Sequence, residues 1–148
     1  MRRRDGPVRD QRDADLLIGD SEEIAWLGER LATGNNPASI HAALGVPTVR
    51  MMGAQGAEAT SDAGWRHMPA IPVGMRDTTV AGDCFVGVLA AALDRGVGLA
   101  TAIRRAAVAA ALSATEVGAR GSLPRASQID AALRHAHQPT DRQSEVPD

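Results

Sequence analysis

The chain has 148 residues, of which 44% are hydrophobic, and its formal charge of -2 comes from 16 basic and 18 acidic residues. This length suits one domain with a single core, and the small net charge gives no sign of a nucleic-acid partner or an anionic membrane surface. No apolar run approaches the roughly 20 residues that span a bilayer, and a single cysteine excludes an internal disulfide, so we expect a cytoplasmic protein.

The two ends of the chain are expected to lie outside the fold. Residues 1–13 combine five arginines with three aspartates and almost no apolar side chains, so they cannot bury enough surface to offset the entropy of ordering. We interpret them as a mobile leader. Residues 137–148 are polar and are expected to be a mobile tail. The folded domain is therefore predicted to comprise residues 14–136.

A strand, a turn and a helix are expected first. Residues 14–18 form a short apolar run, which residues 19–20 (Gly-Asp) interrupt. From Ser21 the apolar residues recur with helical spacing, at Ile24, Leu27 and Leu31. Ser21 is the expected N-cap of this helix, because its hydroxyl can accept a hydrogen bond from the first turn.

The next segment predicts a short helix, a strand and a hairpin. Residues 38–44 have a helical pattern that ends at Gly45, which can adopt the left-handed conformation of a C-cap. Residues 48–52 are rich in strand-forming residues. Residues 57–61 and 65–68 are separated by Asp-Ala-Gly, which predicts a hairpin.

The last part of the domain is helical. Apolar residues recur with helical spacing from residue 81, an alanine-rich helix is expected over residues 100–114, and a final helix over residues 127–133. So many alanines require the middle helix to pack closely against a neighbour. Early alternation of strands and helices, followed by paired helices, predicts an α/β fold in which helices cover a mainly parallel sheet.

The sequence DTTVAGDC at residues 77–84 is the strongest candidate for chemistry. A helix N-terminus leaves amide groups unpaired and carries about half a positive charge, so it can hold an anion such as a phosphate. Ala81 and Gly82 present little side chain to obstruct such an anion. Asp83 adds a carboxylate beside it, which is what accepting the proton of an attacking hydroxyl requires. The alternative is purely structural: residues 77–79 cap the helix and Asp83 complements its dipole.

Other reactive side chains give weaker signals. No histidine is placed by the sequence to activate Cys84, so we interpret this cysteine as a small buried residue. His135 and His137 form an H-x-H pair without further ligands in a polar tail, which favours an incidental pattern over a metal site. The arginines at residues 2–4 have acidic neighbours and are interpreted as a solvated tail.

The segment DTTVAGDCFVGVLAAAL resembles the D-T-x-G-A-G-D-x-F signature of the ribokinase or PfkB-type carbohydrate kinases. Three more segments, in the same order as in that family, resemble its strand followed by N-x-x-E, its strand and glycine turn, and its late helix and loop; they are ADLLIGDSEE, GVPTVRMMGAQGAE and AAALSATEVGARGSLP. The resemblance extends from residue 14 to residue 124 and covers the C-terminal half of a family chain. It implies a Rossmann-like, three-layer α/β/α sheet of the ribokinase-like fold, truncated to that half.

The resemblance also implies an activity, which is ATP-dependent phosphorylation of a sugar or a sugar-like hydroxyl. Asp83 matches the family's general base. Ala81, Gly82 and the amide of Asp83 match the anion hole for the terminal phosphate. Gly53 and Gly56 match the turn that lies against the nucleotide phosphates.

Metal ions are implied in the same way. Glu23 matches the acid of N-x-x-E, which organises Mg²⁺ through its waters. Many relatives also hold a monovalent cation, such as K⁺, in a loop beside the anion hole. The residues that match this loop are Asp77, Thr79, Ser113, Gly118 and Ser122.

Several positions depart from the family pattern. Val80 replaces the first glycine of the anion hole, Asp20 and Ala107 stand where asparagine is common, and Glu116 stands where arginine is frequent. The family's N-terminal half, with its sugar-binding motif and lid, has no counterpart in these residues.

Two hypotheses therefore stay open. The chain is an ATP-dependent carbohydrate kinase, or its ATP-binding half, whose partners are a nucleotide and a small sugar. Alternatively, it is a non-catalytic module that keeps the fold and binds a nucleotide or another protein. In either case the exposed sheet edge can be covered by a second copy or by a separate N-terminal half.

Overall fold

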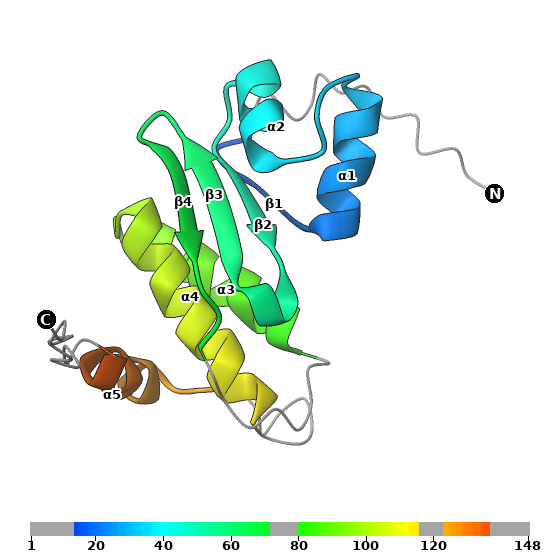
Figure 1. Cartoon of the computed structure of the whole chain (residues 1–148). Coiled ribbons are helices and arrows are strands. Elements are labelled where there is room, and N and C mark those ends of the chain that lie inside the picture. Colours follow the sequence, from blue (N-terminus) through cyan, green and yellow to red (C-terminus); the bar gives the residue numbers. More distant parts are fainter. Residues whose placement is uncertain (1–13, 72–79, 116–122, 137–148) are drawn as a thin grey trace, which may run out of the picture.

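The computed structural model describes residues 14–71, 80–115 and 123–136 (Figure 1). The predicted mobile leader and tail lie outside the described residues. The elements in chain order are β1 (Leu17–Asp20), α1 (Ser21–Arg30), α2 (Pro37–Leu44), β2 (Thr48–Met51), a 3₁₀ turn η2 (Gly53–Gln55), β3 (Ala57–Ser61), β4 (Gly64–Met68), α3 (Ala81–Asp94), α4 (Leu99–Ala114) and α5 (Ala126–Ala136). The described part of the chain thus alternates strands and helices first and ends in helices, as the sequence predicts.

The strands form one mixed sheet in the order β1-β2-β3-β4. β1 and β2 are parallel, whereas β2 with β3 and β3 with β4 are antiparallel. The prediction of a mainly parallel sheet is therefore wrong for the described residues. A parallel pair needs a long crossover, which α1 and α2 supply between β1 and β2, but only short turns join β2 to β3 and β3 to β4.

Helices cover both faces of the sheet, so the predicted three-layer α/β/α arrangement is confirmed (Figure 1). On one face α1 and α2 bury Ile24, Leu27 and Ile40. On the other face α3 and α4 pack on β2 and β3 around a core that includes Val49 and Phe85. α5 packs outside this layer, against α3 and α4.

The start of α1 differs from the prediction by one residue. Asp20, not Ser21, is the N-cap: its carboxylate accepts a hydrogen bond from the Glu23 amide at 2.8 Å, and the Glu23 carboxylate accepts one from the Asp20 amide at 2.9 Å. This reciprocal capping box satisfies two amides at once, which a serine one position later cannot do here. β1 also runs to Asp20, because Gly19 and Asp20 continue its pairing with β2 instead of breaking it.

Other local predictions agree closely with the structure. Gly45 ends α2 with a positive φ of 71°, as expected of a C-cap glycine. The hairpin of β3 and β4 is present, with β4 beginning at Gly64. α4 begins one residue before the predicted start, and α5 extends beyond both predicted ends. Within the described ranges no helix is both long and apolar enough to cross a lipid bilayer.

Candidate functional site

A pocket of about 340 Å³ lies at the carboxyl ends of the parallel strands β1 and β2. Asp20 ends β1 and Met51 ends β2, and both line the pocket. In α/β proteins ligands bind outside the carboxyl ends of parallel strands, so the position itself is informative. The lining residues are Asp20, Met51, Gly53, Ala54, Gly56, Ala70, Ile71, Ala81, Gly82, Phe85, Ala107, Ala110, Ala111 and Ala114.

One wall of the pocket is the turn between β2 and β3, residues 52–56, which we call the glycine turn. Backbone hydrogen bonds close it: the Met52 amide donates to the Gly56 carbonyl at 2.8 Å, and the Gly56 amide donates to the Gly53 carbonyl at 3.0 Å. Gly53 and Gly56 both have positive φ, at 55° and 90°. A Cβ on Gly56 would lie 1.9 Å from the Met68 carbonyl oxygen, so the fold itself requires glycine there.

A second wall is the first turn of α3. The first intrahelical bond runs from the Cys84 amide to the Val80 carbonyl at 2.9 Å, so the amides of residues 81–83 have no partner within the helix. Val80 is the N-cap and its side chain makes no capping hydrogen bond. A Cβ on Gly82 would meet nothing within 4 Å, so packing does not require this glycine. Ala81 and Gly82, whose amides have no partner within the helix, both line the pocket.

A third wall is a face of α4 made only of alanine. The alanines that line the pocket follow the helical spacing i, i+3, i+4, i+7, at Ala107, Ala110, Ala111 and Ala114. Such short side chains leave room for a flat ligand and bring no charge. The expectation that α4 packs closely against a neighbour is confirmed. Ala102 and Ala106 of α4 are buried in one core with residues of α3 and of the sheet.

The structure brings together around one pocket four residues proposed from the sequence as site residues, Gly53, Gly56, Ala81 and Gly82, and two named as departures from the family pattern, Asp20 and Ala107. Asp83 follows Gly82 directly but does not line the pocket, and its side chain is exposed. Glu23 is exposed as well, and one of its carboxylate oxygens accepts the capping bond from Asp20. Neither carboxylate therefore lines the pocket, although Gly82, next to Asp83, and Asp20, which is bonded to Glu23, both do.

Ser113 and Cys84 lie beneath this site and are buried. The Ser113 hydroxyl donates to the Ala110 carbonyl at 2.8 Å. Burial raises the pKa of the Cys84 thiol, and a hydrogen bond with Ser113 opposes that rise. A raised pKa reduces the thiolate fraction, which agrees with the interpretation of Cys84 as a small buried residue.

The proposed cation loop is only partly described. Ser113 is the one member of that set within the described residues, whereas Asp77, Thr79, Gly118 and Ser122 lie outside them, as does Glu116. Within residues 14–71, 80–115 and 123–136, no group of three or more His, Cys, Asp or Glu could hold a metal ion. A Mg²⁺ ion carried by a nucleotide does not need such a group, since it is bound by one or two carboxylates together with phosphate oxygens. Asp20 and Glu23 are the carboxylates available for it.

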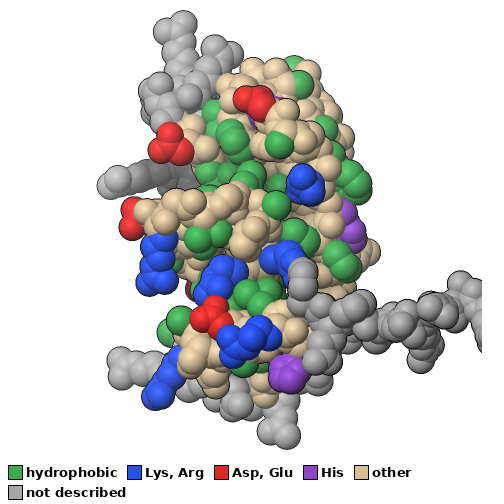
Figure 2. Space-filling model, turned by 90° about the vertical axis from the view of Figure 1, so that its left-hand side faces the viewer, with side chains coloured by type: hydrophobic (Ala, Val, Ile, Leu, Met, Phe, Trp, Pro, Cys, Tyr) green, Lys and Arg blue, Asp and Glu red, His purple; other side chains and the backbone are tan. Residues whose placement is uncertain are grey.

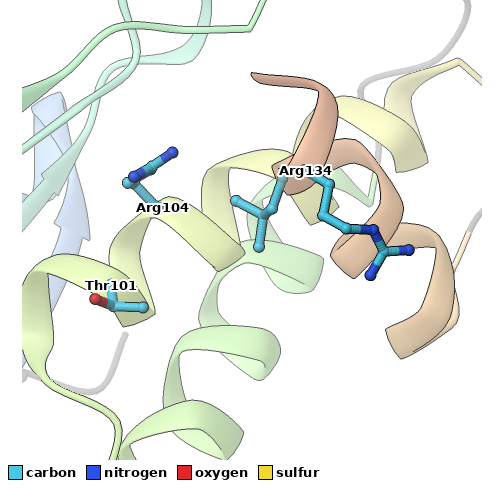
Figure 3. A pocket seen from close by; sticks show the side chains of 4 residues that line it. Thr101, Arg104 and Arg134 are labelled. Atoms are coloured by element: carbon cyan, nitrogen blue, oxygen red, sulfur yellow. The ribbon is translucent and has the colours of Figure 1, made fainter. Parts of the chain in front are cut away.

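A second pocket, of about 330 Å³, lies between α4 and α5 and is lined by Thr101, Arg104, Leu133 and Arg134 (Figure 3). Arginine side chains gather on this side of the molecule (Figure 2). However, Figure 3 shows the side chains of Arg104 and Arg134 extending in different directions. The two guanidinium groups therefore do not converge on one point, and the first pocket, at the ends of the parallel strands, is the better candidate.

Sequence reasoning missed much of the pocket's lining. Met51, Ala54 and Phe85 carry no chemical signal, and Ala70 and Ile71 lie in a segment expected only to be extended. Of the alanine face of α4 only Ala107 was named, as a departure from the family pattern, because regular spacing alone does not show which face of a helix lines a pocket. Asp20 was noticed only as a departure from the family pattern, but it both caps α1 and lines the pocket.

Comparison with known proteins defines the class. The pfkB family carbohydrate kinase domain matches residues 8–126, and the chain therefore belongs to this family. The ribokinase of Lactococcus lactis subsp. lactis (strain IL1403) is 39% identical over 69 residues, which are 47% of this chain and 23% of that protein. The expected ribokinase or PfkB relationship is confirmed.

Solved structures support the fold. The chain matches Arabidopsis thaliana ribokinase complexed with ribose and ATP with a TM-score of 0.70 and 25% identity, covering 83% of this chain and 42% of that one. A ribokinase-II-like protein of E. coli in complex with ATP and Mg²⁺ matches with a TM-score of 0.72 and 25% identity, covering 86% and 41%. The chain thus has a ribokinase-like fold and spans about two fifths of the length of these solved relatives.

Proposed function

We propose that this chain is the nucleotide-binding portion of an ATP-dependent carbohydrate kinase. The observation that carries the proposal is the pocket in which the glycine turn and the unpaired amides of α3 meet, at the carboxyl ends of two parallel strands of a pfkB family chain. The relatives solved with ATP, with ribose and with Mg²⁺ support the choice of ligands.

In this proposal the backbone holds the phosphates. The glycine turn lies along the nucleotide, and the amides of Ala81, Gly82 and Asp83 donate hydrogen bonds to the terminal phosphoryl group. The positive end of the α3 dipole stabilises the negative charge on that group. The stabilisation is greatest in the transition state, because the amides are already in position when the charge develops. The alanine face of α4 accommodates the adenine ring of the nucleotide through apolar contact.

Asp83 is proposed as the general base. The acceptor's hydroxyl oxygen bonds to the γ-phosphorus, the bond from the γ-phosphorus to the bridging oxygen breaks, and its electron pair leaves with ADP. The Asp83 carboxylate takes the hydroxyl proton. Mg²⁺ bound with the nucleotide neutralises charge on the phosphate oxygens. Asp20 and Glu23 are proposed to orient its waters, and Ser113 to contribute to a monovalent cation site with residues outside the described ranges.

A non-catalytic, nucleotide-binding module is the second candidate. It is favoured by one observation, the exposure of the Asp83 side chain. A carboxylate open to water loses much of the benefit of a positioned base, because positioning and water exclusion supply a large share of catalysis. The exposed side of Asp83 is where a sugar-binding portion is proposed to close the site.

Titration with Mg·ATP separates the candidates from a chain without nucleotide binding. We expect heat of binding for the wild type and for Asp83→Asn, and its loss in Ala111→Leu, whose longer side chain fills the pocket. ADP release in the presence of ribose is then measured for the wild type and for Asp83→Asn. Release by the wild type that Asp83→Asn lowers by at least about a hundredfold supports the kinase. Equal rates support the binding module, and absence of binding up to millimolar Mg·ATP contradicts both.

A further inference from the structure

His67 makes a contact with the glycine turn that the proposed mechanism does not use. It lies on β4, and its Nε2 atom is 3.0 Å from the carbonyl oxygen of Gln55. A carbonyl oxygen can only accept a hydrogen bond, so Nε2 carries the hydrogen and donates. The bond therefore joins the edge strand of the sheet to the turn that forms one wall of the pocket.

Gln55 is a residue of the turn that does not line the pocket, whereas Gly53, Ala54 and Gly56 do. Within the turn the Gln55 amide donates to the Met52 carbonyl at 3.1 Å. The His67 bond thus holds the turn from outside, at a residue whose own amide helps to close it.

The orientation of the His67 ring is itself constrained. The ring stacks on the indole of Trp65, with ring centroids 6.2 Å apart and planes 8° from parallel. The Trp65 indole nitrogen donates to the Glu58 carboxylate at 3.1 Å, and Glu58 forms an ion pair with Arg50. Trp65 on β4, Glu58 on β3 and Arg50 on β2 therefore form a chain of side-chain contacts that ends at the imidazole.

A separate observation shows that the turn is fitted to this end of β4. At Gly56 the backbone approaches β4 so closely that a Cβ would lie 1.9 Å from the Met68 carbonyl oxygen and 2.7 Å from the Ala70 amide nitrogen. Met68 directly follows His67 in β4. The turn is thus attached to β4 at two places, by close backbone contact at Gly56 and by a side-chain hydrogen bond at Gln55.

We propose that His67 is a positioning residue that holds the glycine turn in the conformation that shapes the nucleotide pocket. The inference deepens the proposed function and depends on it for the identity of the ligand. Trp65 supports His67 by keeping the ring in plane. His67 touches no part of the proposed nucleotide, so its removal loosens the turn without removing a ligand contact.

His67→Phe tests this proposal, since it keeps a flat ring on Trp65 and removes the donor. His67→Gln returns an N–H donor at a similar reach, and Arg66→Ala on the other face of β4 is the matched control. The first measurement is hydrogen exchange of the Gln55 and Gly56 amides without ligand. We expect roughly threefold to tenfold faster exchange in His67→Phe, which corresponds to one net hydrogen bond of ordinary strength, with recovery in His67→Gln and no change in Arg66→Ala.

The second measurement is the dissociation constant for Mg·ATP, together with the midpoint of urea unfolding. We expect His67→Phe to weaken binding by a factor of about three to ten and to lower the unfolding midpoint by no more than the loss of one hydrogen bond accounts for, while Arg66→Ala changes neither quantity. Unchanged exchange at Gln55 and Gly56, or faster exchange that spreads evenly through β2 and β3, overturns the positioning role. If the wild type binds no Mg·ATP, the proposed function fails, and the exchange result still decides whether His67 holds the turn.

Discussion

Two backbone segments line the pocket, and they are stabilised in opposite ways. The glycine turn is closed by its own hydrogen bonds, is attached to β4 through His67 and requires glycine at position 56. The first turn of α3 has amides without helical partners, an N-cap without a capping side chain, and a glycine that packing does not require. The first segment is thus determined by the fold, whereas the amides of the second have no partner within the helix, as a helix N-terminus that binds an anion requires.

The largest effect is expected from Gly56→Ala in the glycine turn. The new Cβ meets the Met68 carbonyl at a distance no real contact reaches, and φ is positive, so we expect the free energy of unfolding to fall by at least about 3 kcal/mol. Gly53→Ala is the matched control, because its Cβ meets nothing within 4 Å and only the left-handed strain of about 1–2 kcal/mol applies. If urea unfolding gave the same loss of unfolding free energy for Gly56→Ala and Gly53→Ala, the turn would not depend on its contact with β4.

A smaller effect, on binding alone, is expected from Gly82→Ala in the first turn of α3. The methyl group fits the folded protein but occupies the space in front of the unpaired amides, so the affinity for Mg·ATP should fall about tenfold, or about 1.4 kcal/mol. Gly87→Ala in the same helix is the control, since it also meets nothing within 4 Å and lies outside the pocket. Titration calorimetry and urea unfolding of both variants separate affinity from stability. Equal affinities in the two variants would remove the anion-hole assignment.

The smallest effect concerns the inner side of the same turn, at Cys84. Burial covers the thiol and raises its pKa, so fewer thiolates form at a given pH. We expect iodoacetamide at pH 8 to alkylate Cys84 at least about tenfold more slowly in the folded protein than in urea. Saturating Mg·ATP should slow alkylation of the folded protein further, because a ligand that stabilises the native state opposes the opening that exposes the thiol. Fast alkylation of the folded chain would mean that α3 opens far more than its packing indicates.

Local features of the fold could be predicted from the sequence, and features that depend on pairing could not. Gly45 and the hairpin over residues 57–68 have signals within a few residues, and both predictions are confirmed. The direction of the strands depends on the length of the connections, which an α/β pattern leaves open. Asp20 was misassigned because it serves two elements, as the last residue of β1 and the N-cap of α1.

The candidate site divides in a similar way. Ala81 and Gly82 were found because a helix N-terminus that holds an anion needs small residues, whereas Gly53 and Gly56 were found through the resemblance to the ribokinase family. The alanine face of α4 was not found, since spacing alone does not say which face of a helix meets an empty space. The bond from His67 to Gln55 was also out of reach, because it depends on where a turn presents one carbonyl group.

The walls of the pocket come from residues as far apart as Asp20 and Ala114, so no short piece of the chain contains it. A ligand that occupies it can bind only after β1, the hairpin, α3 and α4 have assembled. By mass action, such a ligand at a hundred times its dissociation constant adds about 2.7 kcal/mol to the stability of the native state. Under the proposed function, the supply of nucleotide therefore governs how much of the chain escapes unfolding and proteolysis.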